Sequence, residues 1–168
     1  KISRSTMEFQ LDSYCGLYCG ACFIMNSYRQ NRNDCLPDEW ISPIHDKEIK
    51  CHGCKSDLVF ENCRGCRIRT CAQAKKIEFC NECSEFPCEK INNLKKLNLA
   101  HLKVAIHNLE IIKEIGIQEW LKQQEKRWMC SNCGYSFSWY EKKCTECGID
   151  LFNSIKEKAL LSDLENSL

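Results

Sequence analysis

The hydrophobic and polar positions of the chain predict its clearest helices in the second half. The segment LAHLKVAIHNLEIIKEIG, which ends at Gly116, has apolar residues at helical spacing and is expected to form an amphipathic helix with glycine just beyond its end. The apolar stripe consists of Leu102, Ala105, Ile106, Leu109 and Ile112. IQEWLKQQEKRW predicts a second, charged helix with Trp120 and Leu121 facing inward, and residues 152–168 predict a last amphipathic helix.

In the first half, the same pattern predicts only short helices. One is expected over about Phe23 to Arg29, and another is expected to begin at Phe86–Pro87, because proline is tolerated in the first turn of a helix. Residues 30–50 contain two prolines and many polar groups, which predicts a loop or a loosely folded insertion. Long apolar runs are few in segment 15–88, so we expect a thin apolar core there.

Cysteine changes this picture, since 16 of the 168 residues are cysteines and eight of them lie between Cys51 and Cys88. The spacing C-x2-C-x4-C occurs there twice, seventeen residues apart, so the segment contains a short internal repeat. Its members are Cys63, Cys66 and Cys71, then Cys80, Cys83 and Cys88, with Cys51 and Cys54 before them. Two thiolates separated by two residues can hold one ion on a tight turn, so all eight are expected to bind metal.

A second group of cysteines lies near the start of the chain. In SYCGLYCGACF, Cys15, Cys19 and Cys22 have the spacing C-x3-C-x2-C, and Gly16 and Gly20 allow the backbone to turn closely around an ion. Radical S-adenosylmethionine enzymes use this spacing, but the chain lacks the alternating strands and helices of their barrel. An ion bound by these three thiolates alone would keep a free position for redox or Lewis-acid chemistry.

The most specific metal-site pattern lies near the end of the chain. Cys130 and Cys133 form one pair, Cys144 and Cys147 form another, and each pair is followed by glycine. This spacing is typical of a zinc ribbon, in which two knuckles close tetrahedrally over one ion and the intervening SFSWY segment forms a β-hairpin arm. Four thiolates leave no open coordination position, so catalysis at this ion is not expected.

A few other residues could complete a metal site in the first half. Cys35 has no partner two residues away, so we expect a free, partly buried thiol, with the fourth ligand of the N-terminal group as the alternative. His45 and His52 could bind instead, although a lone histidine is more often structural. His101 and His107 lie on or beside the apolar stripe and are expected to pack or cap, because sites this rich in cysteine have thiols to spare.

Charge and composition exclude several other classes of protein. The formal net charge is +1 with acidic and basic residues well mixed, which gives no global attraction to nucleic acid or to anionic membranes. No apolar run approaches the ~18 residues of a membrane span, and the opening residues do not resemble a signal peptide. Closely spaced C-x2-C pairs favour metal over disulfides. We therefore expect a soluble, cytoplasmic protein.

Zinc is the expected metal, with three or four ions in all. A structural zinc site supplies ~10–16 kcal/mol of folding free energy, which is comparable with the ~5–15 kcal/mol net stability of a whole domain. The ions are therefore expected to form the core of the first half. The eight cysteines could group sequentially, as Cys51/Cys54/Cys63/Cys66 and Cys71/Cys80/Cys83/Cys88, or in an interleaved way. An iron–sulfur cluster is the alternative cofactor, above all at Cys15, Cys19 and Cys22.

The strings CGLYCGAC, CHGC and CRGCRIRTCAQAKKIEFCNECSEFPCEKI resemble the small cysteine-rich bacterial and archaeal family known as domain of unknown function 3795, over about residues 13–95. The continuation HNLEIIKEIGIQEWLKQQEKRWMCSNCG is similar to family members with an appended C-terminal zinc ribbon. The resemblance implies metal binding and no established activity. It implies eleven core cysteines, namely those at 15, 19, 22, 51, 54, 63, 66, 71, 80, 83 and 88, so Cys35 departs from the family pattern.

From these observations we predict a small, metal-stabilised, α-rich domain of irregular α+β character over residues 1–95. A helical connector is expected over residues 96–128, and a zinc ribbon with a terminal helix over residues 129–168. The expected role is that of a binding or scaffold module for protein or nucleic acid, with no membrane partner. An enzyme is not expected unless the N-terminal cysteines hold an iron–sulfur cluster or an ion with a free position.

The arm of the predicted ribbon has the composition of a base-stacking surface. It contains Phe137, Trp139 and Tyr140 next to Lys142 and Lys143. Aromatic side chains interleaved with lysines can stack bases of single-stranded nucleic acid. The alternative is that these aromatics pack onto the helix that contains Trp120 and Trp128.

Overall fold

The structure is a computed structural model that describes residues 8–32, 36–38, 41, 44 and 47–167. Its α-helices are α1 (Phe23–Gln30), α3 (Glu61–Arg64), α4 (Arg67–Lys75), α5 (Glu89–Lys96), α6 (Ala105–Ile115), α7 (Ile117–Arg127) and α8 (Ser154–Asn166), with short 3-10 helices η1 (Cys19–Ala21), η2 (Cys80–Glu82) and η3 (Ala100–Leu102). Within the described ranges there is no β-sheet, only isolated antiparallel bridges at Met129–Ser136 and Lys143–Asp150. The α-rich prediction is confirmed, whereas the expected α+β character is not supported.

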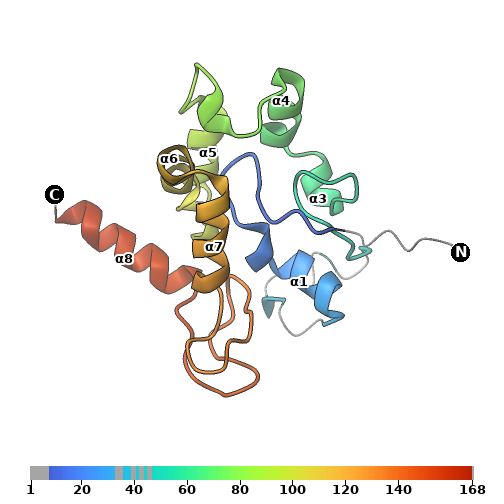
Figure 1. Cartoon of the computed structure of the whole chain (residues 1–168), viewed down its shortest axis with the longest axis vertical. Helices are drawn as coiled ribbons and strands as arrows, with labels where there is room; N and C mark the ends of the chain where they lie inside the picture. Colours follow the sequence, from blue (N-terminus) through green and yellow to red (C-terminus); the bar gives the residue numbers. More distant parts are fainter. Residues whose placement is uncertain (1–7, 33–35, 39–40, 42–43, 45–46, 168) are drawn as a thin grey trace, which may run out of the picture.

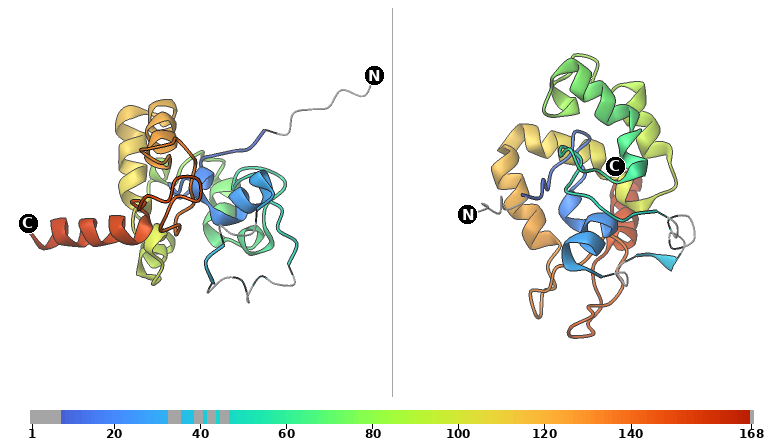
Figure 2. Two further views of the ribbon diagram at one scale, coloured as in Figure 1. Left: turned by 90° about the horizontal axis from the view of Figure 1, so that it is seen from below. Right: turned by 90° about the vertical axis from the view of Figure 1, so that its right-hand side faces the viewer.

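The two ends of the molecule are formed by different cysteine-rich segments. In Figure 1, α4 and α5 lie at one end and the loops of residues 129–153 at the other, with α1, α6 and α7 between them. Helix α8 begins beside η3 and then projects away from the rest of the molecule, as Figure 1 and the left view of Figure 2 show. The first half of the chain and the C-terminal loops are thus linked through the central helices.

The helices predicted from apolar spacing are present with small shifts at their ends. Helix α1 covers the predicted Phe23–Arg29, and α6 ends at Ile115 as the glycine predicted. Gly116 caps α6 and precedes α7 with φ 81°, a backbone conformation that favours glycine. Helix α5 begins at Glu89 rather than at Phe86–Pro87, and Cys88, whose backbone is still extended, is its N-cap.

The apolar core is larger in the first half than its sequence suggests. Met25 of α1, Ile91 of α5, Leu109 of α6 and Trp120 of α7 are fully buried in one continuous cluster. Tyr18 packs edge-on against Trp120 with ring centroids 6.1 Å apart. Helices α6 and α7 therefore supply the apolar surface that segment 15–88 lacks, and metal ions are not its only means of stabilisation.

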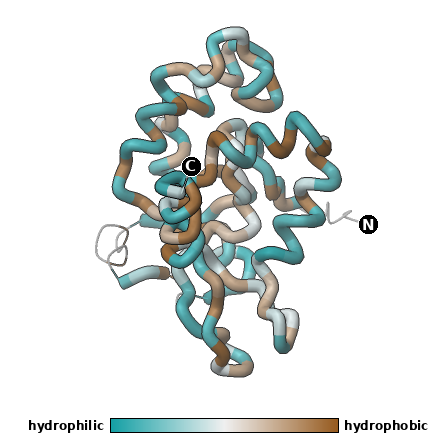
Figure 3. The backbone as a smooth tube through the Cα atoms, turned by 90° about the vertical axis from the view of Figure 1, so that its left-hand side faces the viewer, coloured by the Kyte–Doolittle hydropathy of each residue, from teal (hydrophilic) through white to brown (hydrophobic). Residues whose placement is uncertain are grey.

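Hydrophobic positions are distributed along every helix and are not collected in long runs. Figure 3 shows hydrophobic and hydrophilic positions alternating along the tube, including along α8. Among the described residues, no helix has both the length and the apolar character that crossing a membrane requires.

Candidate metal centres

The four cysteines near the C-terminus come together as a ready coordination sphere. The sulfurs of Cys130, Cys133, Cys144 and Cys147 all lie within 4.8 Å of one another. The Cys130 and Cys147 sulfurs are 3.5 Å apart, as are those of Cys133 and Cys144. Four thiolates at this separation match a tetrahedral ion with zinc–sulfur bonds of ~2.3 Å. The predicted clustering of these four cysteines is confirmed, and they could bind a metal. We call residues 129–153 the ribbon.

Two equivalent turns build this four-cysteine site. The Gly134 N–H donates to the Cys130 carbonyl, and the Gly148 N–H donates to the Cys144 carbonyl, both at 2.8 Å. These glycines have φ 75° and 76°, which a residue with a side chain rarely adopts. A second bond closes each turn, from Cys130 N–H to the Tyr135 carbonyl at 2.8 Å and from Cys144 N–H to that of Ile149 at 2.9 Å. Each turn thus presents its two sulfurs in the same way.

Hydrogen bonding within the ribbon favours a thiolate at Cys147. The backbone N–H of Ile149 and the side chain of Asn132 lower the pKa of Cys147 to about 6. Desolvation raises the pKa of the facing Cys133 thiol, and bonds to the neighbouring sulfurs add to this effect. Cys147 is thus available as a thiolate for an ion at neutral pH, whereas an ion at the Cys133 sulfur must displace a proton.

The aromatic segment of the ribbon is buried and does not form an exposed arm. Phe137 and Trp139 are 3% and 8% exposed. Phe137 packs on Trp128 at 5.4 Å between ring centroids, whereas Trp139 stacks on His101 at 4.1 Å. The Trp139 N–H also donates to the Ala21 carbonyl at 3.0 Å. These contacts fix the ribbon to the first half of the chain and leave little of either ring for stacking a base.

In the first half, seven thiols gather between the N-terminal segment, the loop that follows Cys51 and the start of α4. We call them the seven-thiol group: Cys15, Cys19, Cys22, Cys51, Cys54, Cys63 and Cys66. Burial is the main cause that raises the pKa of the Cys15, Cys19 and Cys63 thiols, and the neighbouring thiols contribute in the same direction. The pKa of Cys63 rises to about 12 in total. The neighbouring thiols are Cys22 and Cys51 for Cys63, Cys54 for Cys19, and Cys66 for Cys15.

Two C-x2-C pairs of the first half, Cys19/Cys22 and Cys63/Cys66, lie on tight turns that directly precede helices. Cys22 donates its N–H to the Cys19 carbonyl at 3.0 Å, and Cys66 donates to Cys63 at 3.2 Å. Cys22 and Cys66 are then the N-caps of α1 and α4, and Cys88 is the N-cap of α5. The positive end of each helix dipole therefore lies at a cysteine, a position that suits the negative charge of a metal-bound sulfur.

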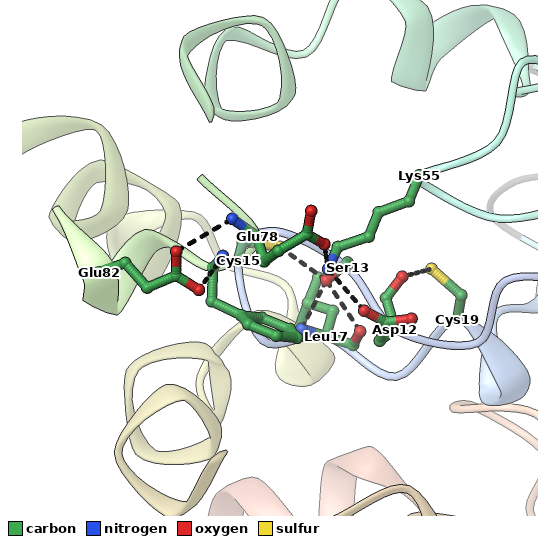
Figure 4. A network of polar contacts seen from close by, with 9 residues as sticks. Asp12, Ser13, Cys15, Leu17, Cys19, Lys55, Glu78 and Glu82 are labelled. Carbon is green, nitrogen blue, oxygen red and sulfur yellow. Dashed lines mark hydrogen bonds and ion pairs between the residues drawn. The ribbon is translucent and has the colours of Figure 1, made fainter. Parts of the chain in front are cut away.

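A charged network fixes the chain segment that bears the first cysteines. Figure 4 shows the Lys55 ammonium between Asp12 and Glu78, at 2.6 Å and 3.2 Å from their carboxylates. The Lys55 ammonium also lies 3.8 Å from the centre of the Phe79 ring. Nearby, the Ser13 hydroxyl lies 3.3 Å from the Cys15 sulfur. The network joins the N-terminal segment to the loops after Cys51 and before η2.

Gly53, in the middle of the Cys51–Cys54 turn, is in close contact with the N-terminal segment. Its φ is 112°, and a Cβ atom built there would lie 1.9 Å from the Gln10 carbonyl oxygen. The Gly53 N–H points at the Cys51 sulfur, 3.4 Å away. Only glycine allows this turn to donate to the sulfur while the two segments are in contact.

The remaining four cysteines of the first half surround a separate small cavity. Cys71, Cys80, Cys83 and Cys88 all line a cavity of about 30 Å³ between α4, η2 and the start of α5. Lys75, one helical turn after Cys71, donates to the Cys83 sulfur at 3.1 Å and pairs with Glu85. Burial raises the pKa of the Cys80 thiol to about 12.

Residues 11–93 match the family model described as Protein of unknown function (DUF3795). This segment belongs to that family. The DUF3795 segment contains the seven-thiol group and the four cysteines around the cavity, whereas the ribbon lies outside it. No curated protein and no solved structure matches the chain.

Within the DUF3795 segment, the predicted ligands lie near one another without forming a finished coordination sphere. Apart from the ribbon, no three potential ligand atoms in the described part of the chain lie within 4.8 Å of one another. Cys35 and His45 fall outside the described residues. His52 is buried between the rings of Phe9 and Tyr28, and its Nε2 has no hydrogen-bond partner among the described atoms.

The histidines of the second half are not assembled with the cysteines. His101 is buried, and its Nδ1 lies 2.7 Å from the Tyr140 hydroxyl. Burial lowers the pKa of His101 to about 3, so the ring is neutral. His101 thus packs as expected, although its partner is the ribbon and not the apolar stripe of α6.

Sequence reasoning missed Lys75, although its spacing of four residues from Cys71 on one helix was a usable signal.

Proposed function

We propose that the protein is a multi-zinc module in which the ribbon cysteines hold one structural zinc ion. The observation that supports this most directly is the 4.8 Å mutual distance of the four ribbon sulfurs. The equivalent hydrogen bonds of the two turns place these sulfurs in position before an ion arrives, which reduces the entropy lost on binding. A closed site of this kind stabilises a fold and leaves no position for a substrate.

The eleven cysteines of the DUF3795 segment are proposed to bind further ions. Thiols that crowd together while burial raises the pKa of several of them are costly as bare thiolates, and a bound cation offsets this cost. Helix N-termini at Cys22, Cys66 and Cys88 add further stabilisation for thiolates. Eleven cysteines are enough for two or three further ions, which together with the ribbon ion gives the proposed three or four ions in the whole chain.

The proposed role of this module is to bind another macromolecule, and a protein partner is better supported than nucleic acid. Ile155, Leu160 and Leu164 of the projecting helix α8 are 49%, 51% and 55% exposed. Apolar side chains on a projecting helix are suited to contact with a protein. The ribbon aromatics that could stack bases are buried, and the formal charge is only +1.

An iron–sulfur protein is the second candidate function, and the seven-thiol group is the observation that favours it. Cys15, Cys19 and Cys22 have the thiols of Cys54 and Cys63 as neighbours, so a cluster there could find its fourth thiolate. Such a cluster would give the protein a redox role, with a potential that depends on its burial and on hydrogen bonds to its sulfurs.

Elemental analysis of untagged protein purified with and without oxygen tests both candidates. The zinc proposal expects a colourless protein with three or four zinc ions per chain. Cys133→Ser is expected to lose one of them, while the neighbouring control Ser131→Ala loses none. A brown protein with iron and sulfide would favour the second candidate. A chain free of zinc and iron, or thiols paired as disulfides, would contradict both.

A binding experiment tests the choice of partner. We expect no mobility shift with single-stranded nucleic acid at low salt, because Phe137 and Trp139 are committed to the core. A shift that weakens as salt is added would instead support nucleic acid as the partner.

A further inference from the structure

We propose that Cys71, Cys80, Cys83 and Cys88 form a second closed zinc site between α4 and α5, separate from the seven-thiol group. This inference rests on the proposed function, because it assigns particular ligands to one of its ions. It assigns Cys71, Cys80, Cys83 and Cys88 to one ion, a grouping that spacing alone leaves open. We call this group of four cysteines the α4–α5 site.

The positions of the four cysteines in the fold favour one shared ion. Cys71 lies within α4, Cys80 begins η2, Cys83 follows η2, and Cys88 is the N-cap of α5. All four line the same cavity of about 30 Å³, which is enough for an ion or a single water. An ion in this cavity would draw the four sulfurs to ~2.3 Å from itself and complete a tetrahedron.

The neighbours of the Cys80 thiol agree with this grouping and identify the boundary of the site. After burial, Cys15 has the largest electrostatic effect on the Cys80 thiol, followed by Cys88, Cys71 and Cys83. Cys15 is not among the residues that line the cavity, and its sulfur lies 3.3 Å from the Ser13 hydroxyl. Cys15 therefore belongs to the seven-thiol group, although it lies close to the α4–α5 site.

The charge around the cavity also suits a four-thiolate ion. Four thiolates and one Zn²⁺ carry a charge of about −2, which nearby cations would partly neutralise. The Lys75 ammonium lies 3.1 Å from the Cys83 sulfur, and Lys90 also lines the cavity. A bond between an ammonium and a metal-bound thiolate orients the ligand and stabilises its charge. The Glu85 carboxylate pairs with Lys75 and holds it beside the sulfur.

Cadmium substitution in the unaltered chain tests the grouping directly. With an NMR-active cadmium isotope in place of zinc, couplings between each cadmium nucleus and cysteine Cβ protons identify the ligands of each ion. We expect one cadmium signal to couple with Cys71, Cys80, Cys83 and Cys88 and not with Cys15. A signal that couples Cys71 or Cys88 with Cys63 or Cys66 would overturn this inference and leave the multi-zinc proposal intact. Absence of any ion in the DUF3795 segment would overturn both.

Substitutions give a second, independent test through zinc stoichiometry. Cys71→Ser, Cys88→Ser and the double variant are each expected to lose the same single ion. Adding Cys133→Ser to the double variant is expected to lose one more, from the ribbon. Loss of two ions in the Cys71→Ser/Cys88→Ser double variant would show that these cysteines serve different ions and would contradict the proposal.

Lys75 provides a test that does not remove a ligand. Lys75→Met keeps an unbranched side chain only one atom shorter and removes the bond to Cys83, so zinc affinity at the α4–α5 site is expected to fall about 10- to 100-fold. Lys90→Met removes an equal charge from the same cavity, but no bond from Lys90 to a sulfur is among the described contacts, so a smaller change is expected. Competition with a chromogenic chelator measures both. Equal effects of the two variants would contradict the assigned role of Lys75.

Discussion

At the scale of residues, the clustering of the four ribbon cysteines is what sequence reasoning predicted best, because the spacing of cysteines is a local property. The groups that surround them were harder to foresee. Lys55 acts with Asp12 and Glu78, which lie far from it in sequence, so nothing in its own neighbourhood predicts the network. Lys75 is different, since it lies one helical turn from Cys71, a predicted metal ligand, so its place near that cysteine could have been inferred from the sequence. Contacts within one helix can be inferred from sequence, whereas contacts between loops cannot.

Gly53 gives a stability prediction at a single residue. Gly53→Ala is expected to destabilise the zinc-loaded protein by about 3 kcal/mol, from the left-handed backbone and the collision with Gln10. Gly148→Ala is the matched control, because its φ is also positive at 76° but nothing lies within 4 Å of the added Cβ. The control is expected to cost only ~1–2 kcal/mol. Denaturant unfolding at saturating zinc measures both, and equal losses would contradict the role assigned to Gln10.

His101 gives a prediction for pH. Its pKa is lowered by burial to about 3, whereas an unfolded histidine titrates near ~6.5, so the unfolded chain binds more protons between these values. Stability is therefore expected to fall as the pH falls below about 6.5, by about 2 kcal/mol between pH 7 and pH 5.

The variant His101→Phe keeps a ring beside Trp139 and cannot titrate. The difference in unfolding free energy between the variant and the parent should therefore change by about 2 kcal/mol between pH 7 and pH 5. Taking this difference also cancels the contribution of thiol titration, which is common to both proteins. Glu157 lies across the small cavity beside His101 and pairs with Arg127, so it is not expected to charge the ring. A constant difference would show that His101 titrates normally in the folded state.

At the scale of elements, amphipathic helices were predicted well, whereas the cysteine repeat does not correspond to a repeat of local structure. Cys71 lies inside α4, four residues after the helix begins, whereas Cys88, its counterpart in the repeat, precedes α5. The same spacing of cysteines thus occurs on different local structures, because the residues between them differ. Spacing predicts which residues bind metal and does not predict which of them share an ion.

The helices that cover the first half also make a prediction about packing. Leu109→Ala on α6 is expected to destabilise the protein by about 2–5 kcal/mol, because the side chain is fully buried in the shared core. Leu164→Ala makes the same chemical change on α8, where the side chain is 55% exposed, and is expected to change stability by less than about 0.5 kcal/mol. Unfolding by denaturant compares them. A similar loss in both would place α8 inside a core that the structure does not show.

At the scale of the whole molecule, the expectation that ions alone would form the core of the first half was wrong, because an apolar core is also present there. Segments distant in sequence supply the other side of this core, and two long-range hydrogen bonds show how closely they pack. Asn108 of α6 donates to the Gly16 carbonyl at 2.8 Å across 92 residues. Asn26 of α1 donates to the Ser138 hydroxyl at 2.9 Å across 112 residues. Periodicity predicts which face of a helix is buried but not what covers it.

These contacts predict that the ribbon and the first half respond together when zinc is removed. Cys133→Ser is expected to raise the hydrogen-exchange rate of the Trp139 amide, which bonds to Ala21, and of the amides of α1. Amides of α5 serve as an internal control, because α5 lies at the other end of the molecule (Figure 1). Faster exchange confined to the ribbon would indicate two independent units.

The Cys80 N–H donates to the Tyr14 carbonyl at 2.9 Å, next to Cys15. One peptide hydrogen bond therefore connects the walls of the α4–α5 site and the seven-thiol group. An ion bound at either centre would hold this hydrogen bond in place, so the other centre would lose less conformational entropy when it fills. Below saturation, zinc binding at the two centres should accordingly be positively cooperative, so a titration should show fewer half-filled chains than two independent sites would give, while either centre still fills alone at saturating zinc.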